Sequence, residues 1–113
     1  MKRVLFDENV PRQLRRELPE FVIRTVQEER WDGFKNGALL RQASPSFDAL
    51  LTADQRLRYQ QNVSQFAIGV VVVETYDTRL RNLRRFLAEI REALTSVGAG
   101  QVIVITEPRQ TRT

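Results

Sequence analysis

Short apolar segments alternate along this chain with segments in which apolar residues recur at helical spacing. The short segments are rich in β-branched residues and predict five strands, at Val4–Phe6, Phe21–Val26, Phe47–Thr52, Ile68–Glu74 and Gln101–Thr106. The segments between them predict four helices, one that ends at Leu18, then Asn36–Ala43, Gln55–Asn62 and Thr78–Val97. This alternation is typical of an α/β domain in which helices cover both faces of a mainly parallel sheet.

Turn and capping residues mark the ends of several of these elements. Asn9 is expected to cap the first helix, with Pro11 in its first turn and Pro19 at its end. The polar residues 27–34 predict a loop, in which Trp31 is expected to cover an edge of the core. The fourth strand is the most apolar, so we expect it to be central in the sheet.

The chain has 113 residues, and it contains neither cysteine nor histidine. Disulfides, thiolate zinc sites, imidazole catalysis and histidine-ligated metals are therefore excluded, so any chemistry must come from carboxylates, amides, hydroxyls and arginines. The longest apolar run, Ile68–Val73, is too short to span a membrane, and the N-terminus is strand-like rather than a signal peptide. We expect a cytoplasmic protein with one domain at residues 1–107, followed by a polar tail at 108–113.

The chain is basic, with a formal net charge of +4, and arginine supplies nearly all of the positive charge. A polyanion such as RNA would be attracted to this surface. An ordinary solvated surface that is rich in arginine would give the same totals, so charge alone leaves both interpretations open.

Acidic residues follow four of the expected strands. Asp7 and Glu8 follow the first strand and Asp54 follows the third; Glu28, Glu29, Glu74 and Asp77 follow the second and fourth. Parallel strands end at the same edge of a sheet, so these carboxylates should gather there. Such a group suits Mg²⁺, which can activate water for phosphodiester cleavage. Asp48 is excluded, because it lies roughly 20 Å back along the third strand.

Each of these acids also has a simpler interpretation. Asp7 or Asn9 could do no more than cap the next helix. The acids after the second strand suit an exposed loop, and those after the fourth suit the cap of the long helix. The pairing of the ends at Asp7 and Asp54 is what favours a metal site.

Two motifs then resemble a known family. The segments Leu-Phe-Asp-Glu-Asn-Val-Pro at 5–11 and Leu-Thr-Ala-Asp at 51–54 are similar to the PIN-like predicted nucleases of bacterial toxin–antitoxin systems. Residues 33–43 resemble that family's middle helix, and residues 55–62 resemble one of its branches. The resemblance covers about residues 1–74.

The resemblance implies a three-layer PIN-like domain with acids that coordinate Mg²⁺ or Mn²⁺ for RNA cleavage. Asp7 matches the first acid of the family pattern, Asp54 matches the acid that closes its Thr-x-Asp motif, and Glu8 is the third metal candidate. In the middle helix the chain departs from the pattern, because Asn36 stands where many members have aspartate and Ala38 where related branches have glutamate. Asn36 remains a catalytic candidate, although an amide oxygen adds no charge to a metal site.

Candidates for contact with the substrate surround these acids. Arg56 and Arg58 could bind phosphates and Tyr59 could stack on a base, while solvated arginines and a packed tyrosine are the simpler alternatives. Thr52 and Asn9 are the two remaining candidates for contact with the substrate. The Thr52 hydroxyl could also form a hydrogen bond with a carboxylate.

Three functions fit these observations to different degrees. The first is a metal-dependent endoribonuclease, the toxin of a pair, held by a cognate antitoxin protein that could bind the arginine face of the last helix. The second is a weakened or inactive PIN-like module that binds RNA or a protein partner. A receiver-like phosphate acceptor is disfavoured, because Glu74 and Thr106 end the strands where a lysine would be expected. The strand edges could also support a homodimer.

Overall fold

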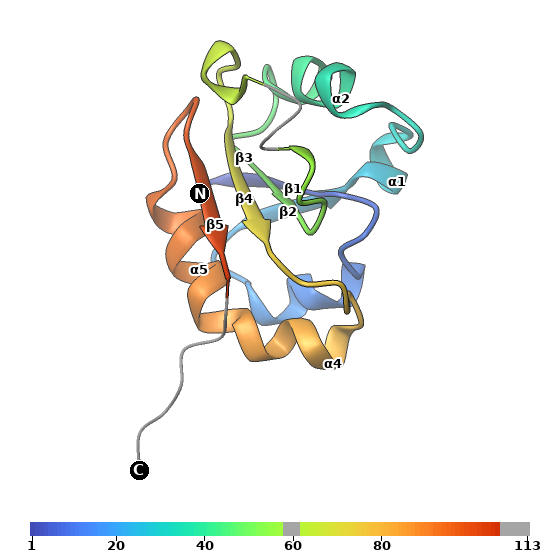
Figure 1. Ribbon diagram of the computed structural model, residues 1–113, viewed down its shortest axis with the longest axis vertical. Coiled ribbons are helices and arrows are strands. Elements are labelled where there is room, and N and C mark those ends of the chain that lie inside the picture. Colours follow the sequence, from blue (N-terminus) through green and yellow to red (C-terminus); the bar gives the residue numbers. More distant parts are fainter. Residues whose placement is uncertain (58–61, 107–113) are drawn as a thin grey trace.

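Five parallel strands form a single sheet in the computed structural model, which describes residues 1–57 and 62–106 (Figure 1). The strands are β1 (Arg3–Phe6), β2 (Val22–Thr25), β3 (Ala49–Thr52), β4 (Gly69–Val73) and β5 (Val102–Ile105). Their order is β2-β1-β3-β4-β5, and each neighbouring pair is parallel. The predicted α/β class with a parallel sheet is therefore confirmed.

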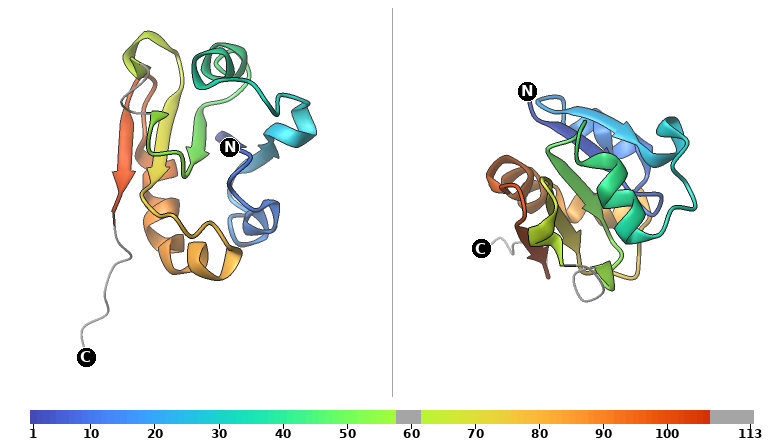
Figure 2. Two further views of the ribbon diagram at one scale, coloured as in Figure 1. Left: turned by 45° about the vertical axis from the view of Figure 1, so that its right-hand side comes forward. Right: turned by 90° about the horizontal axis from the view of Figure 1, so that it is seen from above.

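Helical segments occupy the connections between the strands. They are η1 (Arg12–Glu17), α1 (Val26–Glu29), α2 (Asn36–Ala43), η2 (Val63–Gln65), α4 (Leu80–Leu83), η3 (Arg84–Phe86) and α5 (Leu87–Ser96). Figure 1 and the left view of Figure 2 show η1 beside α4, and α2 lies well away from these two helices. The predicted helix Asn36–Ala43 is confirmed as α2 with the same bounds.

Two buried clusters take alternate side chains from the strands. Val4 and Phe6 of β1 belong to the first cluster and Leu5 belongs to the second. The first cluster also contains apolar side chains of η1, α4 and α5, and the second contains those of α1 and α2. Successive strand residues point to opposite sides, so a strand that is apolar at every position can contribute to both clusters.

The segment after β1 is a 3-10 helix rather than the expected α-helix, and Asn9 does not cap it. Pro11 occupies the N-cap, and no side chain bonds there. Asn9 Oδ1 instead accepts a hydrogen bond from the backbone nitrogen of Ala53, at 3.0 Å. The predicted capping role of Asn9 is wrong, because the turn after β3 uses its amide. Leu14 and Leu18 are buried, as the helical spacing predicted.

A short helix, α1, follows β2 where the sequence predicted a loop. Thr25 Oγ1 accepts from the backbone nitrogen of Glu28 at 3.1 Å, and Glu28 Oε1 accepts from the backbone nitrogen of Thr25 at 2.9 Å. This reciprocal capping ends β2 at Thr25, so Val26 starts a helix instead of extending the strand. The prediction of exposed loop acids at Glu28 and Glu29 was wrong in part, since both lie in α1.

Trp31 covers an edge of the core, as expected. Its ring packs against the second cluster and meets Phe47 edge-on, with 6.0 Å between ring centroids and an interplanar angle of 84°.

The last helix begins later than expected and contains a 3-10 turn. α4, η3 and α5 run consecutively from Leu80 to Ser96, whereas the apolar spacing predicted Thr78–Val97. Asp77 Oδ1 accepts from the backbone nitrogen of Arg79 at 3.2 Å, which holds the preceding residues in a turn.

The predicted fourth strand, β4, is buried throughout and has a neighbour on each side, β3 and β5. The middle strand of the five is β3.

Part of the helix predicted at Gln55–Asn62 lies outside the described residues, as does the tail at 108–113. Leu57, in the described part of that segment, is fully buried. Within the part of the chain that the structure describes, no helix is long and apolar enough to cross a membrane.

Candidate functional site

The candidate site lies where the strand order reverses. The chain passes from β1 to β2 on one side and returns to β3 on the other. Open parallel sheets bind ligands at such a point, beyond the carboxyl ends of the strands. Asp7 follows β1 here, and its backbone nitrogen donates to the carbonyl oxygen of Leu51 in β3 at 2.9 Å. Asp54 lies in the turn that follows β3, so the two predicted ends come together.

Thr52 connects the two acids from beneath. Its side chain is fully buried, and Oγ1 donates to Asp7 Oδ2 at 2.7 Å and accepts from the backbone nitrogen of Asp54 at 3.0 Å. The other Asp7 oxygen, Oδ1, accepts from the backbone nitrogen of Glu8 at 2.9 Å. Both oxygens of Asp7 are thereby held in a fixed orientation at the end of β1.

Asn9 ties the same two strand ends a second time. Besides the bond from Ala53, its Nδ2 lies 3.5 Å from Thr52 Oγ1. The turn after β1 and the turn after β3 are therefore joined by side chains of both. The sequence predicted that these turns would be neighbours, but gave no sign that Asn9 would link them.

Asp54 is surrounded by donors. Its Oδ1 accepts from the backbone nitrogen of Arg56 at 3.0 Å and from Arg56 Nε at 3.1 Å. Its Oδ2 accepts from Arg56 Nη2 and from Asn36 Nδ2, both at 3.3 Å. Asn36 begins α2, so this contact connects α2 to Asp54. The Arg56 side chain itself remains 76% exposed.

The two carboxyl groups differ in their electrostatic environment. Burial raises the pKa of Asp7, while the hydrogen bonds from Thr52 and from the Glu8 backbone lower it less, and the charge of Asp54 raises it further. The hydrogen bond from Arg56 is the largest influence on Asp54 and lowers its pKa. Asp7 is thus a buried acid, and none of the groups that act on its pKa in the described chain is a cation.

A polar recess of about 540 Å³ opens above these acids. Its lining comprises Asp7, Glu8, Asn9, Phe34, Lys35, Asn36, Asp54 and Arg56. Six of these eight residues were predicted as site residues. Phe34 and Lys35 were not, although they directly precede the helix that carries Asn36. Ala38 is exposed and does not line the recess, and Arg58 and Tyr59 lie outside the described residues.

The other candidate acids have structural partners elsewhere. Asp48 Oδ2 accepts from the backbone nitrogen of Arg3 at 2.9 Å. This contact lies at the N-terminal end of β1, away from the carboxyl ends where Asp7 and Asp54 meet, which confirms the exclusion of Asp48. Glu28 pairs with Arg15 at 2.8 Å, and Asp77 pairs with Arg79 at 2.8 Å. Neither acid lines the recess around Asp7 and Asp54. The simpler interpretations are nevertheless wrong in detail, because Glu28 lies in α1 rather than in a loop, and no described side chain caps α4, whose N-cap is Arg79.

The donor set at the recess fits a hard divalent cation. Within residues 1–57 and 62–106, no group of three or more Asp, Glu, His or Cys side chains is arranged to hold a metal ion. Mg²⁺ commonly takes one or two carboxylates, several waters and phosphate oxygens of the substrate. Asp7 and Asp54 supply that minimum, and Glu8 lines the same recess. In this structure the cation beside Asp54 is the guanidinium group of Arg56.

Comparisons with models of protein families, with curated proteins and with solved structures find no significant match to this chain.

Proposed function

We propose that this chain is a Mg²⁺- or Mn²⁺-dependent endoribonuclease with a PIN-like fold, acting in the cytoplasm as the toxin of a toxin–antitoxin pair. The observation that carries the proposal is the state of Asp7. It is a buried carboxylate whose pKa is raised chiefly by burial, the charge that acts on this pKa is that of another acid, Asp54, and both acids line the same recess. Its two hydrogen bonds lower this pKa by less than burial raises it, so the buried charge is costly, and a divalent cation would offset it.

The three-layer PIN-like arrangement is part of the same proposal. Two buried clusters support it, since one draws on α1 and α2 and the other on η1, α4 and α5. The resemblance of segments 5–11 and 51–54 to PIN-like nucleases adds support, because these segments form the two turns at the recess.

Asp7 and Asp54 would hold the metal, with Glu8 as a further oxygen ligand at the rim. A bound Mg²⁺ or Mn²⁺ supplies an activated water and offsets charge on the phosphate. Thr52 and Asn9 keep the two strand ends in register, so the carboxylates are positioned before the substrate binds. Lys35 lines the same recess and is suited to bind a phosphate oxygen of the RNA.

Arg56 has two roles in this scheme. Without metal, its guanidinium neutralises Asp54. Because the side chain is exposed, it can leave Asp54 and bind a phosphate when a metal takes its place. While Arg56 contacts it, the lowered pKa of Asp54 keeps that carboxylate ionised, and a bound cation in place of Arg56 would act in the same direction.

Partner proteins are part of the proposal as well. The arginine face of the last helix is the candidate antitoxin surface; on it, Arg84 is already paired with Glu17 at 2.8 Å. The sheet edges β2 and β5 expose Val22 and Val102 and are the candidate surfaces for a homodimer.

The direct test is cleavage of labelled RNA by the purified full chain with Mg²⁺, with Mn²⁺ and with chelator. Asp7→Asn and Asp54→Asn should each lower the cleavage rate by about 100-fold or more, since each removes a charge that holds the metal. Asp48→Asn is the matched control, because it removes a carboxylate at the opposite edge of the sheet. Cleavage that persists with chelator, or in both site variants, would refute the nuclease.

A second candidate function is a PIN-like module that binds RNA or a protein without cutting. The observation that favours it is the crowding of Asp54, since Asn36 directs its amide nitrogen at Oδ2 and Arg56 contacts both oxygens. Calorimetry with Mn²⁺ separates the two functions. If the wild type binds Mn²⁺ and cleaves RNA, and Asp7→Asn abolishes both, the inactive module is excluded. If the wild type binds RNA but neither binds Mn²⁺ nor cleaves RNA, the inactive module is supported.

A further inference from the structure

Two large aromatic side chains are exposed among the described residues, Phe34 and Tyr76. Phe34 is 44% exposed and lines the recess above the acid pair. Tyr76 is 96% exposed, follows β4, and lines a neighbouring recess together with Asp54 and Arg56. Each exposed aromatic side chain therefore lines a recess that also contains Asp54 and Arg56.

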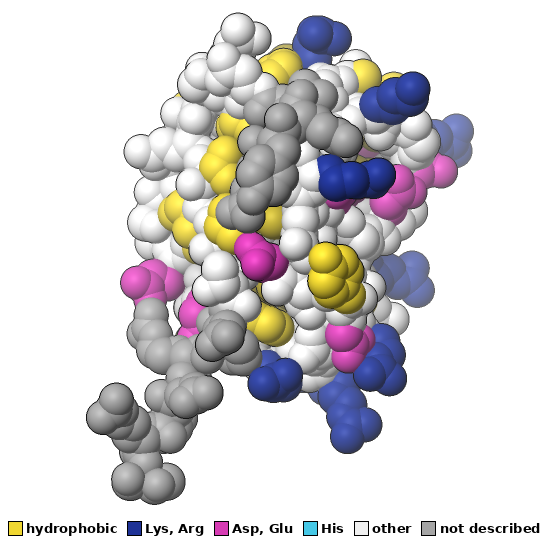
Figure 3. Space-filling view, in the orientation of Figure 1, with side chains coloured by type: hydrophobic (Ala, Val, Ile, Leu, Met, Phe, Trp, Pro, Cys, Tyr) yellow, Lys and Arg dark blue, Asp and Glu magenta, His cyan; other side chains and the backbone are white. Residues whose placement is uncertain are grey.

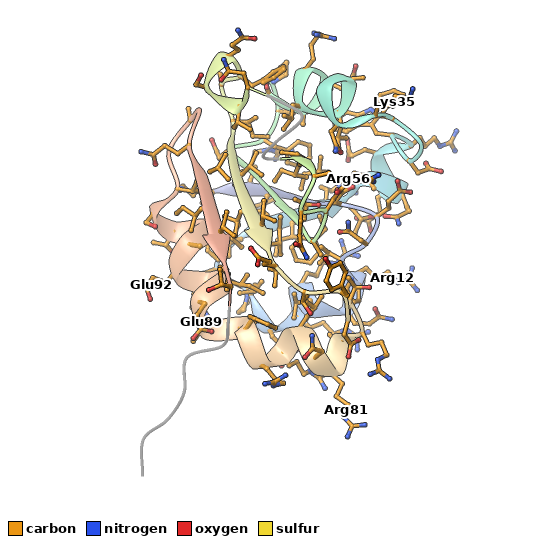
Figure 4. The ribbon with its side chains drawn as sticks, in the orientation of Figure 1. Arg12, Lys35, Arg56, Arg81, Glu89 and Glu92 are labelled. Carbon is orange, nitrogen blue, oxygen red and sulfur yellow. The ribbon has the colours of Figure 1, made fainter. Side chains whose placement is uncertain are left out.

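A third recess lies at the start of the last helix, and its lining includes Asp77, the residue that follows Tyr76. It is lined by Asp77, Arg79, Arg81, Asn82 and Arg85. Three guanidinium groups face one carboxylate there, so this recess is positively charged. In Figure 4, all four labelled basic side chains lie on one side of the molecule, whereas Glu89 and Glu92 lie on the other side; from top to bottom they are Lys35, Arg56, Arg12 and Arg81. Figure 3 shows Lys and Arg side chains along that same edge.

The turn that carries Tyr76 is firmly held. Asn82 Nδ2 donates to Thr75 Oγ1 at 3.0 Å and to the carbonyl oxygen of Asp77 at 2.7 Å, one bond on either side of Tyr76. Arg79 donates to both carboxylate oxygens of Asp77 at 2.8 Å. The backbone of the turn is therefore fixed by these bonds, while the ring of Tyr76 projects into solvent.

We propose that Tyr76, Arg81 and Arg85 form an entry strip that binds single-stranded RNA and leads it to the acid pair. One base stacks on Tyr76 and the arginines bind the phosphates that follow it. Aromatic rings beside a basic groove bind single strands because every base has a face that can stack. A duplex hides those faces, so the strip discriminates against it. The strip rests on the proposed nuclease function for its direction, but it makes a separate claim about binding.

Binding is measured by fluorescence anisotropy, using labelled single-stranded RNA and the full chain in the presence of chelator. Without metal no cleavage is expected, so the strip is tested apart from the chemistry. Tyr76→Ala should weaken binding by about 5- to 150-fold, the range of stacking on one aromatic ring. Tyr76→Phe keeps the ring and should stay within about twofold.

Arg81→Gln tests the charged part of the strip. It should weaken binding and reduce the slope of log affinity against log salt by about one contact. Arg41→Gln is its matched control, since Arg41 is an exposed arginine at the end of α2 that lines none of the three recesses. That variant removes the same charge and should change binding much less.

Three results would overturn the strip. One is equal affinity of the wild type and Tyr76→Ala for the single strand, which would point instead to a protein as the occupant of this surface. The second is that Tyr76→Ala weakens the binding of a strand that lacks bases as much as it weakens the binding of single-stranded RNA. The third is that Tyr76→Ala weakens the binding of a duplex of the same sequence by the same factor. Cleavage that is normal in Tyr76→Ala with unchanged affinity refutes the strip alone. Binding that depends on Tyr76, in a protein that never cleaves RNA with any metal, refutes the nuclease alone.

Discussion

Thr52→Val exchanges one buried hydroxyl for a methyl group of nearly the same shape. The variant loses the 2.7 Å hydrogen bond to Asp7, and the backbone nitrogen of Asp54 loses its acceptor. A hydrogen bond to a charged group contributes about 1.5–3 kcal/mol, so we expect the free energy of unfolding to fall by about that amount. For a chain of this length, at about 4 °C per kcal/mol, the melting temperature should fall by about 6–12 °C.

The loss should depend on pH, because the Thr52 hydroxyl stabilises the ionised form of Asp7. Its hydrogen bond lowers a pKa that burial has raised. Removing the hydroxyl therefore raises the pKa of Asp7 in the folded variant still further. The difference between wild type and variant is largest where Asp7 is ionised in both, and it shrinks as the pH falls through the folded-state pKa of Asp7, leaving the loss at the backbone nitrogen of Asp54. Urea unfolding of both proteins, from neutral pH downwards, measures it.

A control and a double-mutant cycle make this result specific. Thr52→Ser keeps the hydroxyl and loses a methyl, so it should cost about 1 kcal/mol at every pH. In the Asp7→Asn background, the effect of Thr52→Val should shrink by about 1–2 kcal/mol, since the charged partner is gone. A coupling free energy below about 0.5 kcal/mol, or a loss that does not change with pH, would refute the assigned contact.

Three further predictions concern other positions. Gly69→Ala would place a Cβ 2.7 Å from a methyl of Val97, so we expect a loss of about 1–3 kcal/mol in chemical denaturation, and an unchanged midpoint would contradict this packing. Glu28 should titrate by NMR at about 2, so it stabilises the fold above pH 4.5 and loses that contribution as pH falls through 2; Arg15→Met should return the midpoint towards 4.5. Arg56→Gln should tighten Mn²⁺ binding several-fold in calorimetry, because it removes the guanidinium that competes with the metal for the carboxylate of Asp54. Weaker binding would count against the site.

The sequence predicted the sheet and the meeting of its acidic ends for one physical reason. Parallel strands end on the same side of a sheet, so acids that follow different strands lie on that side, and those that follow neighbouring strands lie close together. The strand order itself was not predicted, because it depends on which edges pair during folding. Asp7 and Asp54 could be chosen from the spacing alone, whereas their contact through Thr52 could be seen only once β1 and β3 were neighbours.

The errors arose where one residue type has two uses. An asparagine after a strand can cap the next helix or reach the neighbouring turn, and the choice depends on tertiary contacts that no local pattern contains. Asn9 takes the second use. At Thr25 the error was different, because the Thr-x-x-Glu spacing was visible in the sequence. The run of apolar residues up to Val26 favoured a longer strand and concealed the capping box.

The turn after β3 and the turn after β4 share a local pattern that bears on the site. In each, an aspartate accepts from the backbone and the guanidinium of the arginine two residues later, Asp54 with Arg56 and Asp77 with Arg79. The pairing of Asp54 with Arg56 is therefore turn chemistry of this chain, and it is not in itself evidence of function. What distinguishes the first turn is its contact with a buried acid, since Thr52 bonds both Asp54 and Asp7. The functional argument consequently depends on Asp7, and a metal that failed to bind there would remove the reason for the site.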